Sequence, residues 1–363
     1  MKSGFFRRIF PPPEFLSTPA TGMDVSDESI HLVELVPAPD GLRLGRYGSE
    51  KVPEGVLKEG DPQDMPAFVE LLKQLRKKYG IKFANVSLPE QHGYVLVVKI
   101  PKMELKDVYS NIELQLEEHV PLPASEAVFS YDIVRGLEPD ARDMELNLTA
   151  YPRAIIEKYV EAFAQAGILP LRFEIEAHAT SRCVIPEDAP GVYMLVDLGL
   201  TRTGIYIVRD GYLRFSSTVN LGGNTLTKAL ARELKLSFDE ADKLMQANGL
   251  TSDPNDPQST QIARALMPTI SAMQDEVNKH YMYWNTHTDN YGKQRPPIDQ
   301  ITLVGGLANL PGFPEYLEAN LKTHVNMANV FVNVNPLEDY IPPIPYNYSL
   351  TYAPAIGLAL LQS

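Results

Sequence analysis

Two aspartates stand in the same local pattern at two distant places in this chain. Asp24 lies at the end of a short apolar segment and is followed by a polar bend, and Asp197 repeats this arrangement. A bend of this kind exposes backbone N–H groups that can cradle phosphate oxygens, while the carboxylate can hold a hydrated Mg²⁺. The pair therefore predicts a site for a magnesium-bound phosphate compound.

Hydroxyl groups and glycines accompany both aspartates. The bends offer one glycine and four hydroxyls as candidate phosphate contacts: Ser26, Ser29, Gly199, Thr201 and Thr203. Further along, Gly305 and Gly306 follow an apolar strand, and their missing side chains would let a nucleoside lie against the backbone. Each element alone is common in proteins, but two matched bends and a later glycine pair favour a nucleotide site.

The segments around the two aspartates also share their order of elements. In each, a strand leads through a polar turn to a second strand, an Asp-Gly turn and a third strand. The first copy opens near residue 21 and the second at residues 192–196. Such an internal repeat of architecture predicts two similar α/β lobes that face each other. Apolar residues at helical spacing predict a helix at 65–79 in the first lobe.

Residues 93–173 read as an inserted α+β unit of the first lobe. Strands are expected at 94–100, 127–134, 145–151 and 171–175, with one helix after the first strand and one after the third. The resulting order, β-α-β-β-α-β, is that of a ferredoxin-like unit or a rearrangement of one.

The remaining chain is expected to be helical first and mixed afterwards. Residues 223–284 have helical periodicity, and Pro268 is a candidate kink in the last of these helices. Short apolar segments predict strands at 301–304 and 330–334. Small and apolar residues at 352–361 predict a C-terminal helix.

Composition limits the classes of protein that remain. The chain is 44% hydrophobic, which suffices for a sizeable core, and its net charge of −13 opposes binding to nucleic acid. Cys183 is the single cysteine, so an internal disulfide is excluded and a buried thiol is expected. No apolar run reaches the roughly 20 residues that span a bilayer, which favours a cytoplasmic protein. Residues 1–20 read as a basic, apolar tail that either docks on a membrane or partner or packs on its own domain.

The matched bends and the glycine pair resemble the nucleotide-binding motifs of the actin-like ATPase superfamily, which includes Hsp70, FtsA and sugar kinases. Residues 22–35 are similar to its first phosphate motif, 196–201 to its second and 303–313 to its adenosine motif. Within this superfamily the chain is similar to the PilM branch of type IV pilus assembly. The marks of that branch are Glu-Glu-His-Val-Pro-Leu-Pro at 117–123, Ala-Gly-Ile-Leu-Pro at 166–170, Glu-Ile-Glu-Ala at 174–177, Asn-Leu-Gly-Gly at 220–223 and Tyr-Ala-Pro-Ala-Ile-Gly-Leu-Ala at 352–359.

The resemblance implies an α/β, actin-like fold of two duplicated RNase H-like lobes around a nucleotide cleft. It adds the small α+β domain that this branch shares with FtsA. The expected parts are a tail (1–20), the first lobe (21–92), the insert (93–173), a return to the first lobe (174–190), the second lobe (191–222 and 299–335), a helical subdomain (223–298) and a C-terminal segment that packs on the first lobe (336–363).

The resemblance also implies ATP or ADP with Mg²⁺ as the ligand. Asp24 and Asp197 would hold the metal through water, and Asp27, Gly222, Gly223 and Asp242 are further binding candidates.

The chain departs from the family pattern inside this site. Ser26 replaces a glycine, Asp27 and Glu28 add negative charge near the phosphates, and Met245 stands where a lysine is usual. If that helix is aligned correctly, Met245→Lys would strengthen nucleotide binding. No residue is nominated to activate water, so slow hydrolysis or binding without turnover is expected.

The implied function is a scaffold at the inner face of the cytoplasmic membrane in type IV pilus assembly. Its implied partners are the N-terminal peptide of a PilN-like membrane protein, other platform proteins and a motor ATPase; a homo-oligomer stays open. The peptide would dock between the first lobe and the insert, with Leu116, Val120, Pro121 and Leu122 as its candidate wall. An FtsA-like division protein and a small-molecule kinase are the alternatives. The place of the insert argues against the kinase, and the end of the chain after its last helix argues against FtsA.

Overall fold

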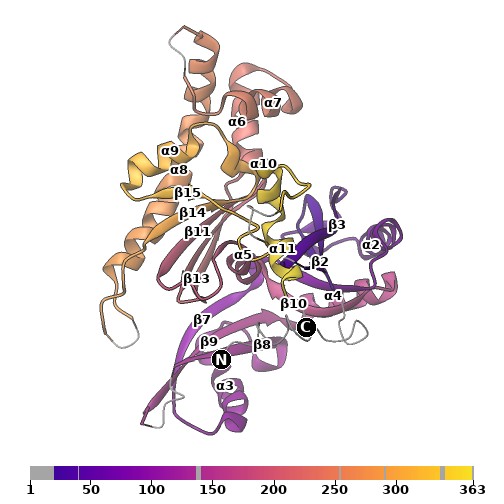
Figure 1. The fold of residues 1–363 in the computed structure, drawn as a ribbon, viewed down its shortest axis with the longest axis vertical. Helices are drawn as coiled ribbons and strands as arrows, with labels where there is room; N and C mark the ends of the chain where they lie inside the picture. The colour runs from indigo at the N-terminus through magenta and orange to yellow at the C-terminus, as the bar shows by residue number, and fades with distance from the viewer. Residues whose placement is uncertain are drawn as a thin grey trace.

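The computed structural model describes residues 20–39, 41–135, 140–252, 255–289, 292–335 and 340–361. Two five-stranded sheets form the centres of two lobes, with a small α+β insert at one end and a helical subdomain at the other (Figure 1). Except for Ala20, the predicted N-terminal tail lies outside the described residues.

The first sheet has the strand order β10-β6-β1-β2-β3. Its strands are β1 (Thr21–Val25), β2 (Ser29–Ala38), β3 (Gly41–Lys51), β6 (Phe83–Leu88) and β10 (Leu169–Ile175). The first three are antiparallel neighbours, whereas β6 runs parallel to both β1 and β10. The short strands β4 (Leu57–Lys58) and β5 (Asp61–Pro62) form a separate pair.

Helix α2 (Met65–Tyr79) has the bounds that the apolar spacing predicts. Asp64 caps its first turn by accepting a hydrogen bond from the Ala67 amide at 3.0 Å. Gly80 ends the helix in the left-handed region, at a φ of 66°. The helix buries one apolar face, which consists of Phe68, Val69, Leu72 and Leu75.

The second sheet repeats the first, with the strand order β13-β12-β11-β14-β15. Its strands are β11 (Val192–Leu198), β12 (Thr203–Arg209), β13 (Tyr212–Val219), β14 (Gln300–Val304) and β15 (Val325–Met327). As in the first sheet, the first three strands along the chain, β11 to β13, are antiparallel neighbours. Strand β14 runs parallel to both β11 and β15. The predicted repeat is thus confirmed. The strand predicted at 330–334 is wrong: 325–327 pairs with β14, and residues 330–334 form turns.

The parallel pairing of β6 and β10 overturns the predicted ferredoxin-like insert. Neighbouring parallel strands need a crossover connection, usually a helix, and α4 (Arg153–Ala166) is that helix. It packs on the first lobe, where the rings of Phe68 and Tyr159 lie 5.6 Å apart and the Tyr159 hydroxyl donates to the Gly60 carbonyl at 2.7 Å. Residues 153–173 therefore belong to the first lobe, and the insert lies inside its crossover.

The insert is a three-stranded antiparallel sheet with one helix. Its elements are β7 (Tyr94–Pro101), α3 (Leu105–His119), β8 (Ala127–Arg135) and β9 (Asp143–Pro152), in the sheet order β7-β9-β8. Alternate residues of β9 face the helix and build a core separate from that of the lobes: Met144, Leu146, Leu148 and Ala150. The other face of the sheet carries polar residues and packs against β13.

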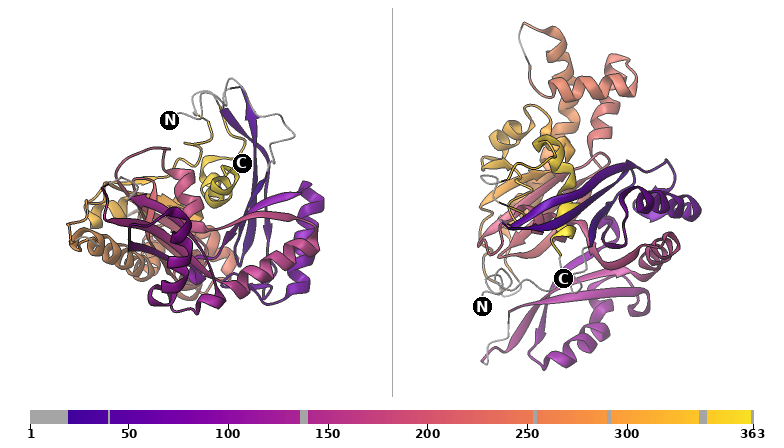
Figure 2. Two further views of the ribbon diagram at one scale, coloured as in Figure 1. Left: turned by 90° about the horizontal axis from the view of Figure 1, so that it is seen from below. Right: turned by 45° about the vertical axis from the view of Figure 1, so that its right-hand side comes forward.

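The helical subdomain joins β13 to β14 and lies at the end of the molecule opposite the insert (Figure 2). It consists of α6 (Gly223–Leu234), α7 (Phe238–Asn248) and α8 (Pro257–Thr286), and α8 continues through Pro268. Helix α9 (Phe313–Leu321) then connects β14 to β15, and the short α10 (Tyr346–Ser349) follows. In the part of the chain that the structure describes, no helix combines the length and the apolar character needed to cross a membrane.

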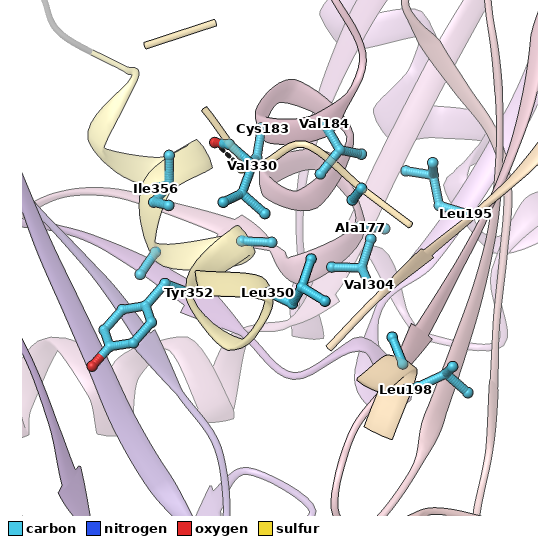
Figure 3. Packing of buried hydrophobic residues seen from close by; sticks show 14 of the residues in the cluster. Ala177, Cys183, Val184, Leu195, Leu198, Val304, Val330, Leu350, Tyr352 and Ile356 are labelled. Carbon is cyan, nitrogen blue, oxygen red and sulfur yellow. Dashed lines mark hydrogen bonds between the residues drawn. The ribbon is translucent and has the colours of Figure 1, made fainter. Parts of the chain in front are cut away.

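Two short helices pack between the lobes. These are α5 (Glu176–Val184), which leaves the first sheet, and α11 (Ala353–Ala359), which returns the C-terminal segment to β1. A Cβ on Gly357 would lie 1.8 Å from the Ala179 carbonyl oxygen, so only glycine permits this contact. Figure 3 shows Cys183 beside Val330 and near Ile356; its buried thiol donates to the Val330 carbonyl at 3.2 Å.

Candidate functional site

Asp24 and Asp197 occupy equivalent positions in the two sheets. Each lies near the end of a central strand, where Asp24 pairs with His31 of β2 and Asp197 pairs with Gly204 of β12. The Ser87 hydroxyl donates to Asp24 Oδ1 at 2.7 Å and fixes that carboxylate. Burial is the largest cause that raises the pKa of Asp24 to about 6, and the charge of Asp197 raises it further. The structure thus brings the two predicted aspartates into one electrostatic field.

Polar side chains of the first bend, between β1 and β2, form hydrogen bonds that fix its conformation. The Ser26 hydroxyl donates to the Ser29 carbonyl at 2.9 Å and accepts from the Ser29 amide at 3.2 Å. The Asp27 carboxylate accepts from the amides of Glu59 at 2.8 Å and Gly60 at 2.7 Å. Ser26 and Asp27 thus hold the bend in this structure, where the loop between β4 and β5 binds the charge of Asp27, and their phosphate contacts stay a prediction.

Backbone amides of both bends remain available. Among the described residues, the amides of Asp27 and Glu28 in the first bend and of Leu200 and Thr201 in the second donate to no protein acceptor. Unpaired amides of successive bend residues form the kind of concave donor surface that binds phosphate oxygens. These amides are therefore the candidate donors for the cradle that the sequence predicts.

Hydrogen bonds within the second bend, between β11 and β12, and from Thr203 to the segment before α6 hold its conformation. The Gly199 amide donates to the Arg202 carbonyl at 3.0 Å, and the Thr203 hydroxyl donates to the Leu221 carbonyl at 2.7 Å. A Cβ on Gly222 would lie 2.6 Å from the Leu200 carbonyl oxygen. Gly222 thus allows the start of α6 to pack on the bend, where the Gly223 amide donates to the Gly199 carbonyl at 3.0 Å. The hydroxyl of Thr203 is structural, whereas Thr201 keeps part of its surface exposed.

The glycine pair lies directly against the second aspartate. Gly305 has a φ of +84°, and a Cβ there would lie 2.7 Å from Asp197 Oδ1 and 2.5 Å from the Leu198 carbonyl oxygen. Gly306 is exposed. The structure therefore places the predicted adenosine motif beside the predicted metal-holding carboxylate.

Met245 is buried, which disfavours the lysine that the family pattern has at this position. Its side chain is only 4% exposed and packs between α6 and α7, where the Thr227 hydroxyl approaches its sulfur at 3.8 Å. Asp242, one turn earlier, accepts from Gln246 at 2.7 Å and from Thr227 at 3.4 Å. Since Met245 faces a core, a lysine there would bury its ammonium group.

Three charged residues near the aspartates were missed by the sequence reasoning. Arg202 of the second bend donates from Nη2 to Oε1 of Glu176, the first residue of α5, at 2.5 Å. Both side chains are about one-tenth exposed, at 10% and 9%. Burial raises the pKa of Glu176 to about 7, although the Arg202 charge lowers it. Two signals pointed to Glu176: its position at the start of a helix after a strand, and its place in the Glu-Ile-Glu-Ala motif at 174–177.

Glu90 is the third of these residues. It lies just after β6, 4% exposed, and accepts from the Ala177 amide at the start of α5 at 3.3 Å. Burial raises its pKa to about 7, and Glu176 adds to this shift. The pKa of Asp197 is raised to about 7 by the same causes, burial first and Glu176 second. The four carboxylates therefore form one coupled acidic site.

This donor set fits a hydrated Mg²⁺ carried by a nucleotide. Among the described residues, no three His, Cys, Asp or Glu side chains are placed to hold a metal by themselves. Mg²⁺ typically keeps several waters and uses one or two carboxylates together with substrate phosphates. Asp24 and Asp197 would supply the carboxylates, and the glycines would leave space for the phosphates and the nucleoside.

The predicted wall of the peptide groove is corrected in part. Leu116 is fully buried and Val120 is 3% exposed, both inside the insert's own core. Pro121 is exposed and Leu122 is half-buried. A cavity of about 860 Å³ lies instead between the other face of the insert and the lobes. Its lining comes from β8 and β9, from β10 and α5, and from the turn between β12 and β13.

Two duplicated lobes with an aspartate on each central strand define an actin-like fold. The chain belongs to the type IV pilus assembly protein PilM family, whose model matches residues 22–363. The structure resembles that of a PilM-PilN type IV pilus biogenesis complex, with a TM-score of 0.78 at 20% identity, over 94% of this chain and 98% of that one.

More distant relatives share the fold. MreB5 of Spiroplasma citri bound to ADP has a TM-score of 0.54 at 13% identity, over 94% of this chain and 95% of that one. The cell division protein FtsA of Enterococcus hirae is 23% identical over 385 residues, which cover 93% of this chain and 86% of FtsA.

Proposed function

We propose that this chain is a nucleotide-binding scaffold of the type IV pilus platform at the inner face of the cytoplasmic membrane. It takes ATP or ADP with Mg²⁺ in the cleft between the lobes. It takes the N-terminal peptide of a PilN-like membrane protein in the cavity beside the insert. Contacts with other platform proteins and with a motor ATPase belong to the same proposal.

The observation that carries nucleotide binding is the equivalent placement of Asp24 and Asp197 on the central strands of the two sheets. These carboxylates would orient the waters of Mg²⁺, which neutralises phosphate charge when bound. The free amides of the two bends would hold the phosphate oxygens, and Gly305 would let the nucleoside approach the backbone. A structure of MreB5 that contains ADP shows that this fold accommodates a nucleotide in another protein.

Slow hydrolysis follows from the ion pair between Arg202 and Glu176. A carboxylate with a pKa near 7 can accept a proton from water, so Glu176 is the candidate base. The ion pair holds this carboxylate away from that task in the arrangement described here.

A thermal-shift titration tests nucleotide binding. MgATP at millimolar concentration should raise the melting temperature of the chain, since a ligand of the folded state stabilises it. Asp197→Ala should remove the shift. Absence of any shift with the unaltered chain, for both ATP and ADP, would contradict the proposal.

Peptide binding is supported by the position of the cavity between two open sheet edges. Strand β8 ends the sheet of the insert, β10 ends the first sheet, and both line the cavity. An extended peptide can add its backbone to such an edge while its side chains enter pockets. The solved complex of PilM with PilN, similar to this chain in fold, gives the partner class.

Fluorescence polarisation with an N-terminal PilN-type peptide from the same genome tests this site. Ser130 lies in the cavity on β8, and Ser130→Trp should fill it and weaken binding at least tenfold. The matched control is Ser110→Trp, on the exposed side of α3 outside the cavity lining, which should bind as the unaltered chain does. Equal binding by both variants would place the peptide elsewhere.

A further inference from the structure

Arg202 stands at the centre of the acidic site. Its charge lowers the pKa of four carboxylates, those of Asp24, Glu90, Glu176 and Asp197. The side chain is about one-tenth exposed, so it is largely buried but keeps some access to solvent. The residue is thus a cation placed where a phosphate compound would arrive.

The backbone of Arg202 is fixed by the phosphate cradle itself. Its carbonyl accepts from the Gly199 amide at 3.0 Å, and a Cβ on Gly222 would lie 2.7 Å from its amide nitrogen. The guanidinium therefore starts from the same bend whose free amides, those of Leu200 and Thr201, are candidates for phosphate oxygens.

The guanidinium has N–H donors that bond no acceptor among the described residues. Its Nη2 atom bonds Glu176, whereas Nη1 and Nε bond no acceptor among the described residues. Arginine carries five N–H groups in a planar fork that matches the oxygens of phosphate. An arginine whose remaining donors are not bonded to protein, beside a cradle of free amides, is arranged to bind a second oxyanion.

The negative charge of the acidic site favours such a cation. Four carboxylates already influence one another here, and a polyphosphate bound beside them would add further negative charge at short range in a medium of low dielectric. Mg²⁺ compensates part of that charge, and a charge-assisted hydrogen bond from arginine compensates more.

We propose that Arg202 is a phosphate-binding residue of the cleft, which exchanges its bond to Glu176 for the terminal phosphate of a bound nucleoside triphosphate. This inference rests on the nucleotide binding proposed above. The exchange would also release Glu176, so that one event both recognises the third phosphate and frees the candidate base.

The exchange predicts opposite effects for the two partners of the ion pair. Arg202→Gln removes the phosphate contact and should weaken ATP binding about tenfold to a hundredfold, the usual range for a charged hydrogen bond. Glu176→Gln keeps an acceptor of the same shape but removes the competing charge, so ATP binding should tighten several-fold. ADP, which lacks the third phosphate, should respond less to either change.

Isothermal titration calorimetry with Mg²⁺ and a non-hydrolysable ATP analogue, and separately with ADP, measures these effects. Glu90→Gln is the matched control: it removes a buried carboxylate of the same site that bonds the Ala177 amide and not Arg202. A gain in Glu90→Gln equal to that in Glu176→Gln would show a general charge effect and overturn the exchange.

Arg202→Gln could weaken ATP binding merely because the variant fails to fold. A double variant separates these two causes. Removing one partner of a buried ion pair leaves an unpaired charge, whereas Arg202→Gln combined with Glu176→Gln removes both charges. The double variant should fold and still bind the ATP analogue at least tenfold more weakly than the unaltered chain. Binding as tight as that of the unaltered chain would overturn the inference.

The outcomes separate this inference from the proposed function. If the unaltered chain binds neither ATP nor ADP, nucleotide binding itself fails. If it binds both and the double variant binds equally well, only the role of Arg202 fails. Equal losses in Arg202→Gln and Glu176→Gln would mark a purely structural ion pair and would also overturn the exchange.

Discussion

Arg214 of the second lobe and Glu145 of the insert form a buried ion pair, with 2.6 Å between Nη1 and Oε1. Both side chains are 6% exposed, and Arg214 also donates to Asn147 Oδ1 at 3.3 Å. The insert is joined covalently to the first lobe alone, at both of its ends. The ion pair therefore gives it a second attachment, to β13 of the other lobe.

Arg214→Ala should lower the free energy of unfolding by about 3 kcal/mol, because it leaves the carboxylate of Glu145 buried and unpaired. Urea denaturation measures this loss, and hydrogen exchange should rise in β9. Arg209→Ala is the control, since its ion pair with the exposed Asp210 should contribute less than about 1 kcal/mol. Equal losses in both variants would contradict the assigned role of the buried pair.

Gly22→Ala should destabilise the chain through the contact between β1 and α11. A Cβ at residue 22 would lie 2.0 Å from the Ala355 carbonyl oxygen, so the helix must shift, at a cost of roughly 3 kcal/mol. Gly211→Ala, at a φ of +80° with open space around it, should cost only about 1 kcal/mol of backbone strain. Thermal unfolding of the two variants compares these costs, and a smaller loss for Gly22→Ala would contradict the close packing.

Met245→Lys should lower the melting temperature without improving nucleotide affinity. The ammonium group would enter the apolar contact between α6 and α7, where burying an unpaired charge costs several kcal/mol. Differential scanning calorimetry and titration with MgATP measure the two effects. Met245→Leu, which keeps the apolar volume, should leave both unchanged, and tighter ATP binding by Met245→Lys would restore the family role for this position.

Stability should fall as the pH rises from about 5 to 7. The pKa of Glu90 in the folded chain, about 7, exceeds its ordinary value, so the folded state retains a proton that the unfolded state loses. The stabilisation is present at low pH and is lost as the pH rises through the folded pKa, with a slope of at most about 1.4 kcal/mol per pH unit.

Glu90→Gln should reduce this pH dependence. Urea denaturation at pH 5.5 and 7.5 should give the unaltered chain a larger loss than the variant, by roughly 1 kcal/mol or more. The remaining dependence in the variant comes from the other raised carboxylates, Glu176 among them. Identical losses in the two proteins would show that Glu90 does not titrate in this range.

Local patterns gave reliable predictions where one strand or helix decides the outcome. The apolar spacing predicted α2 with its observed bounds, and the repeated order of strands predicted both sheets. The strand at 169–175 was also predicted nearly in place, but its assignment to the insert was wrong. Its partner is β6, which lies some 80 residues earlier, and an edge strand carries no local mark of the sheet that it joins.

The residues of the candidate site likewise divide into those that the local sequence predicts and those that it does not. Its aspartates could be located from the sequence because each follows the same local pattern of an apolar strand and a polar bend, and its glycines because close backbone approaches require that residue type. The charges of Arg202, Glu176 and Glu90 could not be located in this way, because they meet only when the second bend, α5 and the segment after β6 come together. Leu116 and Val120 were misplaced because an apolar helix face looks alike whether it packs inward or lines a groove.

The sequence by itself determined the duplicated architecture, the two aspartates and the membership of an actin-like family, since these depend on periodicity and on residues close together in the chain. Only the tertiary structure decided which side chains hold the bends, which buried charges influence one another and which face of the insert borders a cavity. The physical reason is that burial and electrostatic coupling depend on distances between segments far apart in the chain, and no local pattern specifies those distances.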